Sequence, residues 1–353
     1  MSLLKVGLVL SGGGAKGAYQ VGVVKALHEL GVDVGAVAGA SIGALNAAIL
    51  ASAPSFEKGI EHMETLWKGL ASTSPLSANF PAYLKLLLAA GLSLSIPGRR
   101  LLSAIQLARS LGVPVPQIAE QFEDGLLSDD PLRKLMDQYL DVEALRKGLP
   151  LYVSVFRSQG ALRDILSTFA AELGMMDTPE SDFLHIQALP VADQKNALLA
   201  SAAIPLLFAS KKVQDSSYSD GGMGGWQKLQ GNTPITPLLQ AGFKQVIVTH
   251  LSDGSLWSRQ DFPDATVIEI RPQSSIERGA AVGDLLGFDP NKIPSWIEQG
   301  YVDTKHCVGR VMESVQARNE LRQSEVALSK GEQAFTTSEL MLADAMAKLR
   351  SSQ

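Results

Sequence analysis

This 353-residue chain contains little cysteine and few aromatic residues, and neither positive nor negative charge is in large excess. A single cysteine, Cys307, excludes an internal disulfide and a cysteine-rich zinc site, and is typical of a reducing compartment. Lysine and arginine number 31 against 36 aspartates and glutamates, so we expect no nucleic acid partner. Only 19% of the residues are charged while 46% are hydrophobic, which is enough apolar material for a large core.

Long hydrophobic runs are also missing. The apolar residues 6–10 follow Lys5 and precede no small-residue cleavage site, so they predict a buried strand rather than a signal peptide. Another apolar stretch, residues 84–96, is interrupted by Lys85 and Gly91 and is too short to cross a bilayer. We therefore expect a cytoplasmic protein without a membrane anchor.

The first fifty residues alternate between strand and helix signals. Residues 5–10 and 34–38 are apolar runs that predict strands. Residues 19–30 carry apolar side chains at helical spacing and end at Gly31, a typical helix terminus. A helix of small residues follows the second strand to about residue 51. This order predicts a right-handed parallel βαβ unit buried on both faces.

The remaining chain is less regular. Residues 54–150 show helical periodicity broken by prolines, and we interpret them as a helical insertion that covers one end of the sheet. The tail from Val311 onward is helical and charged, and no heptad pattern stands out in it. Strand signals return at residues 151–156, 244–251 and 265–271.

A glycine-rich loop, Gly-Gly-Gly-Ala-Lys-Gly at residues 12–17, separates the first strand from the first helix. Glycine permits close approach, so several backbone N–H groups can converge on an anion there. The pattern also fits a dinucleotide-binding fingerprint, which requires an acidic residue at the end of the second strand. That strand ends in Gly39-Ala40-Ser41 instead. Alone, the loop fits a nucleotide phosphate site, an oxyanion hole or a plain turn.

Residues 39–43, Gly-Ala-Ser-Ile-Gly, form a second motif between a strand and a helix. In this context G-x-S-x-G is typical of a nucleophile elbow, where the serine lies on a strained turn and glycines relieve the crowding. The helix N-terminus would favour negative charge developing at Ser41. The pentapeptide also occurs in ordinary turns, but its context here favours a nucleophile.

Asp220, followed by Gly221 and Gly222, lies in a polar run that alone fits a glycine-capped turn. A carboxylate beside a serine hydroxyl can accept its proton, and partial burial would raise its pKa and favour the transfer. His250 offers an alternative, because Ser41, Asp220 and His250 follow the chain order of an α/β-hydrolase triad. That fold places several strands before its nucleophile, whereas only two precede Ser41 here.

Taken together, these motifs resemble the patatin-like phospholipases, and the match covers roughly residues 5–52 and 150–272. Lys16 stands where many members carry arginine, which keeps the charge but not the planar fork. The resemblance rests on residues 12–17, on residues 39–48, on residues 200–205 with Phe208, on Ser219-Asp220-Gly221-Gly222, and on Asn232-Thr233-Pro234-Ile235.

The resemblance implies an α/β fold: a doubly wound, mostly parallel sheet flanked by helices, with the helical insertion after the nucleophile helix. It implies a phospholipase A or lysophospholipase that forms an acyl-enzyme on Ser41, uses Asp220 as base, and needs no histidine, metal or other cofactor. The resemblance also assigns eight glycines to the site: Gly12, Gly13, Gly14 and Gly17 of the oxyanion loop, Gly39 and Gly43 of the elbow, and Gly221 and Gly222 after the aspartate.

We expect a catalytic domain over residues 1–275, which includes the insertion at about 54–150, and a mainly helical extension over residues 276–353 packed on it. Two other functions remain open: a nucleotide-binding α/β protein, and a catalytically silent effector or scaffold on the same fold. An oligomer or a regulatory partner is compatible with each of these functions.

The expected partners are a phospholipid or other fatty-acyl ester and, peripherally, a membrane surface. Residues 76–111 are rich in leucine and include Arg99 and Arg100. They fit either an internal helix or a lid whose apolar face enters the lipid interface while the two arginines meet anionic head groups.

Overall fold

The computed structural model describes residues 5–73, 130–172, 174–203, 209–252, 257–274, 276 and 289–351. The chain divides into two compact units, Met1–Lys305 and His306–Gln353. The leucine-rich residues 76–111, with Arg99 and Arg100, lie outside the described residues, as does most of the expected insertion. None of the helices in the described ranges combines the length and apolar character needed to span a membrane.

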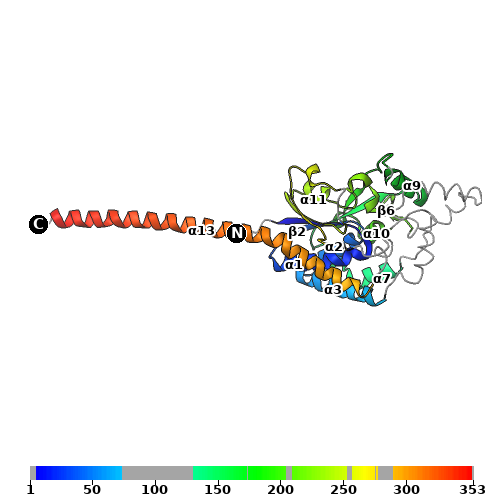
Figure 1. Cartoon of the computed structure of the whole chain (residues 1–353), viewed down its shortest axis with the longest axis horizontal. Coiled ribbons are helices and arrows are strands. Elements are labelled where there is room, and N and C mark those ends of the chain that lie inside the picture. Colours follow the sequence, from blue (N-terminus) through cyan, green and yellow to red (C-terminus); the bar gives the residue numbers. More distant parts are fainter. Residues whose placement is uncertain are drawn as a thin grey trace, which may run out of the picture. The chain divides into compact units, whose positions relative to one another are not determined.

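Eight strands of the described residues form one sheet in the first unit (Figure 1). The strand order is β5-β6-β3-β2-β1-β7-β8, and β4 pairs with β3. The pairs that join β3, β2, β1, β7 and β8 are parallel, whereas β4 and β6 run antiparallel to β3. The strands are β1 (Val6–Leu10), β2 (Val34–Gly39), β3 (Leu151–Arg157), β4 (Asp182–His185), β5 (Lys211–Val213), β6 (Ser216–Asp220), β7 (Gln245–Thr249) and β8 (Thr266–Ile270).

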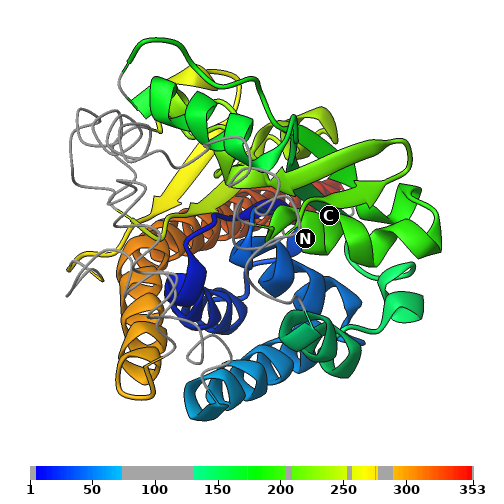
Figure 2. The same ribbon diagram turned by 90° about the vertical axis from the view of Figure 1, so that its right-hand side faces the viewer.

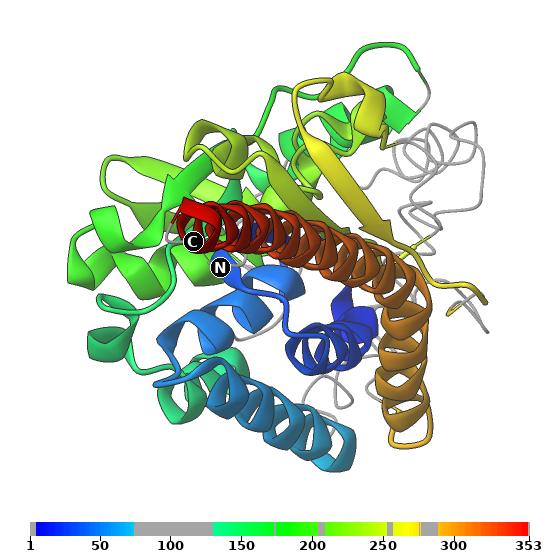
Figure 3. The same ribbon diagram turned by 90° about the vertical axis from the view of Figure 1, so that its left-hand side faces the viewer.

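Helices cover both faces of this sheet. Figures 2 and 3 show α1, α2 and α3 on one face and α11 on the other. The helices are α1 (Ala18–Glu29), α2 (Ile42–Ser52), α3 (Phe56–Thr73), α7 (Asp130–Tyr139), α8 (Val142–Leu145), α9 (Ala161–Glu172), α10 (Val191–Ser201), α11 (Thr236–Gln240) and α13 (Lys292–Ser351), with short 3₁₀ helices at Gly14–Gly17, Ile186–Ala188, Gly221–Met223, Trp226–Lys228 and Arg259–Asp261.

Burial on both faces explains why the central strands are continuous apolar runs. Val9 of β1 and Val248 of β7 lie in a fully buried cluster with Leu238 of α11. The intervening residues Leu8 and Leu10 are also completely buried, and successive side chains of a strand point to opposite faces. The doubly wound, mostly parallel α/β fold predicted from the sequence is confirmed.

The strands predicted at residues 5–10, 34–38, 151–156, 244–251 and 265–271 are confirmed as β1, β2, β3, β7 and β8. The strands β4, β5 and β6, which pair antiparallel, carry no such signal, because they are short and none is a continuous apolar run. One of them matters for the site: β6 carries Asp220 at its end, in a run expected to be a turn.

The tail helix α13 begins at Lys292, well before Val311. Its first residues belong to the first compact unit, which ends at Lys305. There the helix lies directly on α1: a methyl group placed on Gly300 would lie 2.0 Å from the carbonyl oxygen of Tyr19. The Tyr19 hydroxyl donates to Asp303 at 3.0 Å.

Candidate active site

Ser41 lies on a sharp turn between β2 and α2, at the point where the parallel strands end. Its backbone has φ 51° and ψ −124°, a conformation that side-chain-bearing residues rarely adopt. A methyl group on Gly39 would lie 2.5 Å from the Gly43 carbonyl oxygen, and one on Gly43 would lie 2.0 Å from that of Leu10. The elbow therefore requires both glycines, and it leaves Ser41 partly exposed.

Asp220 ends β6 and is buried, with 8% of its surface exposed. One carboxylate oxygen accepts a hydrogen bond from the backbone N–H of Gly222 at 2.8 Å, and the carboxylate also accepts one from the Ser41 hydroxyl. Burial raises the pKa of Asp220 to about 6, although these two hydrogen bonds act to lower it. The structure thus brings the two predicted residues together and makes Asp220 a stronger base than an exposed aspartate.

The glycine loop lies directly against Ser41. A methyl group on Gly12 would lie 3.1 Å from Ser41 Cβ. Gly13 and Gly14 are partly exposed, and their N–H groups have no hydrogen-bond acceptor among the described residues. Gly14 has φ 59°, which favours glycine. These two donors are therefore available to an oxygen atom bound beside Ser41.

Gly17 closes the loop against the start of the nucleophile helix. A methyl group there would lie 2.7 Å from the Ile42 side chain and 3.0 Å from that of Trp67. The Lys16 side chain between these glycines is also buried, at 8% exposed. The end of the loop is therefore packed against α2 and α3.

A fully buried polar network, which the sequence does not reveal, fixes the loop. Gln20 donates to the Ser11 carbonyl at 2.7 Å, just before the glycines. Asn46 on α2 donates to the Gly17 carbonyl at 3.0 Å and to Gln20 at 2.8 Å. Trp67 in turn donates to Asn46 at 3.0 Å. Buried networks in which each member is satisfied rigidify a site, so this one fixes the loop to the nucleophile helix.

Asn232 holds the loop from the opposite side. Its backbone carbonyl accepts from Gly12 N–H at 3.3 Å, and its side-chain amide donates to the Gly12 carbonyl at 3.5 Å. Its side-chain oxygen lies 2.5 Å from a methyl group placed on Gly12 and 3.0 Å from one placed on Gly222. Asn232 therefore links the glycine loop to the turn that follows Asp220.

The turn after Asp220 is equally crowded. A methyl group on Gly221 would lie 2.0 Å from the Ser154 carbonyl oxygen. The Gly221 carbonyl accepts hydrogen bonds from the hydroxyls of Ser154 and Ser181 at 3.1 and 2.7 Å. The adjacent glycines thus let β6 end close to β3, which sets the position of the carboxylate.

A second serine supports the elbow. The Ser201 hydroxyl, fully buried at the end of α10, accepts a hydrogen bond from the Ser41 backbone N–H at 2.9 Å. The sequence places Ser201 in a block that resembles the family but assigns it no role. Its spacing from Ser41 along the chain gives no sign of this contact.

His250 is not brought to the pair. It is buried at the end of β7, where its Nε2 lies 3.2 Å from a carboxylate oxygen of Glu269 and its ring contacts Trp257. The hydrogen bond with His250 lowers the pKa of Glu269 despite partial burial. Among the described ranges, no three histidine, cysteine, aspartate or glutamate side chains lie close enough to hold a metal ion.

Comparison with known proteins gives short, strong local matches. Lysophospholipase nte1 of Aspergillus terreus is 59% identical over 46 residues, which are 13% of this chain and 3% of that protein. Neuropathy target esterase sws of Drosophila melanogaster is 53% identical over 47 residues, again 13% and 3%. The chain thus matches only a small part of these relatives' length.

Among solved structures, VipD from Legionella pneumophila aligns with 84% of this chain and 67% of that chain, at 16% identity and a TM-score of 0.37. A profile of the patatin-like phospholipase family matches residues 8–239. That range runs from β1 to α11 and contains the glycine loop, the elbow, Asp220 and Asn232. The chain belongs to the patatin-like phospholipase family.

Proposed function

We propose that this chain is a serine lipid acyl hydrolase of the phospholipase A or lysophospholipase type, with Ser41 as nucleophile and Asp220 as its base. One observation carries the proposal: a serine on a strained elbow is hydrogen-bonded to a buried carboxylate whose pKa is raised. A nucleophile held beside a positioned base is the general requirement for covalent catalysis. The names of the curated relatives support a lysophospholipid or another fatty-acyl ester as substrate.

In the first step the Ser41 oxygen bonds to the ester carbonyl carbon while its proton passes to Asp220. The bond to the alcohol then breaks, and the alcohol leaves with the proton from Asp220, which gives an acyl-enzyme. In the second step water attacks the acyl group, again losing a proton to Asp220. Return of that proton to Ser41 releases the fatty acid.

Negative charge develops on the carbonyl oxygen in both steps. The N–H groups of Gly13 and Gly14 are the donors that would stabilise it, since they follow Gly12, which lies against Ser41, and have no acceptor among the described residues. Removal of one such donor typically costs about 3 kcal/mol in the barrier. The buried network around Gln20 and Asn46 would keep these donors in place before the substrate binds.

Asp220 suits the role of base at neutral pH. With a pKa of about 6 it is roughly 90% ionised at pH 7 and still binds a proton more strongly than an ordinary aspartate. His250 is engaged with Glu269 instead, so the proposal assigns it no proton transfer. It also assigns no step to a metal or to any other cofactor.

The two alternative functions, nucleotide binding and a silent scaffold, do not account for Ser41 and Asp220. A nucleotide-binding protein would give Ser41 and Asp220 no role, although the fold positions both. A silent scaffold would not need a strained serine, which costs stability. Peripheral contact with a membrane is part of the proposal, because the expected substrate is a lipid. Cytoplasmic localisation and a regulatory partner are proposed with it, without support from the substrate.

Hydrolysis of a chromogenic fatty-acyl ester, and of lysophosphatidylcholine, tests the proposal. We expect Ser41→Ala and Asp220→Ala each to abolish release of fatty acid, while His250→Ala retains most of it. Asp215→Ala, an exposed aspartate in the turn before β6, is the matched control. A fluorophosphonate probe should label the wild type at Ser41 only. Loss with His250→Ala as deep as with Ser41→Ala would replace the pair by a triad.

A further inference from the structure

Large apolar side chains recur every seven positions along the second unit, His306–Gln353, whose described residues are all helical. Four are well exposed: Leu321 at 61%, Leu328 at 65%, Phe335 at 65% and Leu342 at 63%. Leu349 continues the spacing in the sequence. A seven-residue repeat keeps side chains on one narrow stripe of a helix, which is the pattern that pairs helices in coiled coils.

A small residue follows each of these large ones three positions later. In heptad notation the large residues occupy position a and the small ones position d. The small residues are Ser324, Gly331, Ser338 and Ala345, and Ala317 holds the same position one heptad earlier. In the sequence alone the repeat is obscured, because only one of the two core positions in each heptad is large. We call this surface, residues 317–349, the heptad stripe.

We propose that the heptad stripe binds the same stripe of a second copy of this chain, with the two helices antiparallel. In that orientation each position a faces a position d, so every large side chain fills the space left by a small one. One register satisfies all layers together, and a two-fold axis repeats them. The layers are Leu321 with Ala345, Leu328 with Ser338, Phe335 with Gly331, and Leu342 with Ser324, the second of each from the other copy.

A parallel pair fits the same residues poorly. It would place Phe335 against Phe335 and Gly331 against Gly331, so that layers with too much volume would alternate with voids. Both overpacking and cavities are destabilising in a packed core. The regular alternation of large and small residues is therefore complementary to itself only when the helices run in opposite directions.

The charged residues at the edges of the heptad stripe support this antiparallel register only in part. In the same register Glu320 lies opposite Lys348 of the other copy, and two-fold symmetry gives this pair twice. The other edge brings Glu332 beside Glu332 and Glu325 beside Glu339. Exposed charge pairs contribute little and are screened by salt, whereas the layers bury Leu321, Leu328, Phe335 and Leu342 of both copies. Association should therefore tighten, not weaken, as salt is added.

The charge balance argues against a membrane surface as the occupant. Residues 306–353 contain six lysines and arginines and six aspartates and glutamates. Helices that lie in lipid head groups are rich in basic residues on the polar face.

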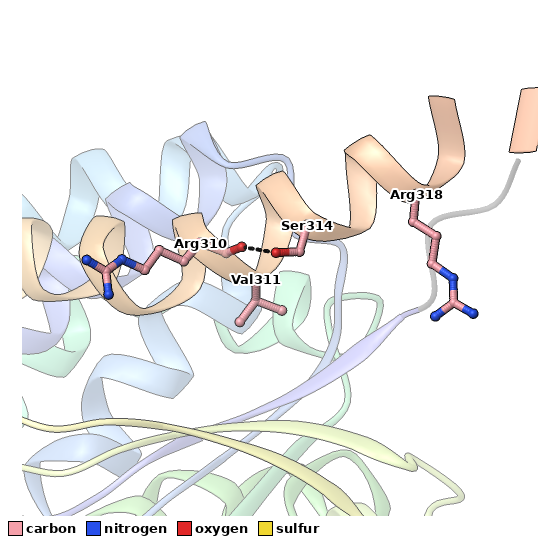
Figure 4. A pocket seen from close by; sticks show the side chains of 4 residues that line it. All are labelled: Arg310, Val311, Ser314 and Arg318. Carbon is pink, nitrogen blue, oxygen red and sulfur yellow. Dashed lines mark hydrogen bonds between the residues drawn. The ribbon is translucent and has the colours of Figure 1, made fainter. Parts of the chain in front are cut away.

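The stripe also has a clear beginning. One heptad upstream its two core positions hold Arg310 and Ser314, which with Val311 and Arg318 line a hollow (Figure 4). The Ser314 hydroxyl donates to the Arg310 carbonyl at 2.9 Å. The two core positions, Arg310 and Ser314, are polar, so the paired segment begins at Ala317.

Light scattering of the full chain during size-exclusion chromatography tests the pairing. We expect a dimer of twice the 37.6 kDa chain mass. Leu328→Glu with Phe335→Glu should raise the dissociation constant at least about a hundredfold. The matched control is Val326→Glu with Leu340→Glu, because both side chains are exposed on the side away from the stripe. A monomeric wild type, or equal loss in the control, would overturn the proposal.

Disulfide trapping tests the orientation, in a Cys307→Ser background. Leu321→Cys with Ala345→Cys should cross-link two chains on oxidation, whereas Leu321→Cys alone should not, because its two copies would lie about 36 Å apart. Cross-linking of the single variant would show a parallel pair. Circular dichroism of each variant confirms that the chain has folded, so a loss of pairing is distinguishable from unfolding.

Discussion

The carboxylate of Asp220 accepts a hydrogen bond from the hydroxyl of Ser41, yet burial still raises the pKa of Asp220 to about 6. The hydrogen bonds from Ser41 and from the Gly222 backbone lower the pKa by less than burial raises it. The ionised carboxylate is therefore less stable in the folded protein than in the unfolded chain. The burial that makes Asp220 a stronger base therefore also lowers the free energy of unfolding once Asp220 is ionised.

The pH dependence of hydrolysis should follow this carboxylate. Because only ionised Asp220 can accept the proton of Ser41, kcat/KM should fall about tenfold per pH unit below a midpoint near 6. Initial rates on a soluble acyl ester between acid and alkaline pH measure this. His250→Gln is the control, since His250 is the histidine that the chain order offers for a triad. A midpoint that disappears in His250→Gln would assign the titration to histidine instead.

Asp220→Asn should stabilise the protein at high pH. Above the unfolded pKa of 3.8 the unfolded chain releases the Asp220 proton while the folded protein retains it, so the free energy of unfolding falls until the pH passes about 6. The difference of about 2 pKa units corresponds to ~3 kcal/mol. The neutral amide avoids this loss. We expect a gain of up to ~3 kcal/mol at pH 8 that shrinks towards zero near pH 4.

Urea unfolding at pH 8 and at pH 4 measures the effect. Asp215→Asn, at an exposed aspartate close by, should show no such pH-dependent gain. If Asp220→Asn lowered stability equally at both pH values, lost packing or hydrogen bonding would outweigh the buried charge.

Gly13→Val should slow hydrolysis more than it weakens folding. Its Cβ would lie 2.7 Å from Cβ of Leu251, so the loop must shift and carry its N–H groups away from the substrate carbonyl. Loss of one oxyanion donor predicts a decrease of about a hundredfold in kcat. Gly69→Ala is the control, because a methyl group there meets nothing within 4 Å. Full turnover by Gly13→Val with an unchanged melting temperature would exclude the loop from the reaction.

The central strands could be predicted because their sequences are apolar on both faces, as in Val6–Leu10 of β1. The β6 strand could not: Ser216–Asp220 is polar, and its register is set by pairing with β3, far away in the sequence. Ser41 and Asp220 could be predicted as candidates because glycines mark the turns that hold them.

The residues that hold the site in place carry no such mark. Gln20 and Asn46 are ordinary polar residues on helices, and only the fold shows that they meet at the glycine loop. The contact of Ser201 with the Ser41 backbone depends in the same way on where α10 ends. Local spacing thus identifies candidate reactive groups, whereas their support depends on contacts between distant segments.

Asn232 should act as a positioning residue for the oxyanion loop. It contacts Gly12 through its backbone and its side chain, and its side-chain oxygen lies near Gly222 as well. Asn232→Ala removes the side-chain link, so we expect kcat to fall about tenfold, with KM nearly unchanged and a loss of stability of about 1 kcal/mol. Asn291→Ala, at an exposed asparagine, should change neither.

Asn232→Asp separates this role from packing alone. The aspartate has nearly the same shape but would place a negative charge beside Asp220 and beside the oxygen on which charge develops. We expect it to lower kcat further than Asn232→Ala and to raise the pH midpoint of the rate, because a nearby like charge raises the pKa of Asp220. Kinetics of both variants across the pH range measure this. If Asn232→Asp kept wild-type rates and midpoint, Asn232 would serve only to fill space.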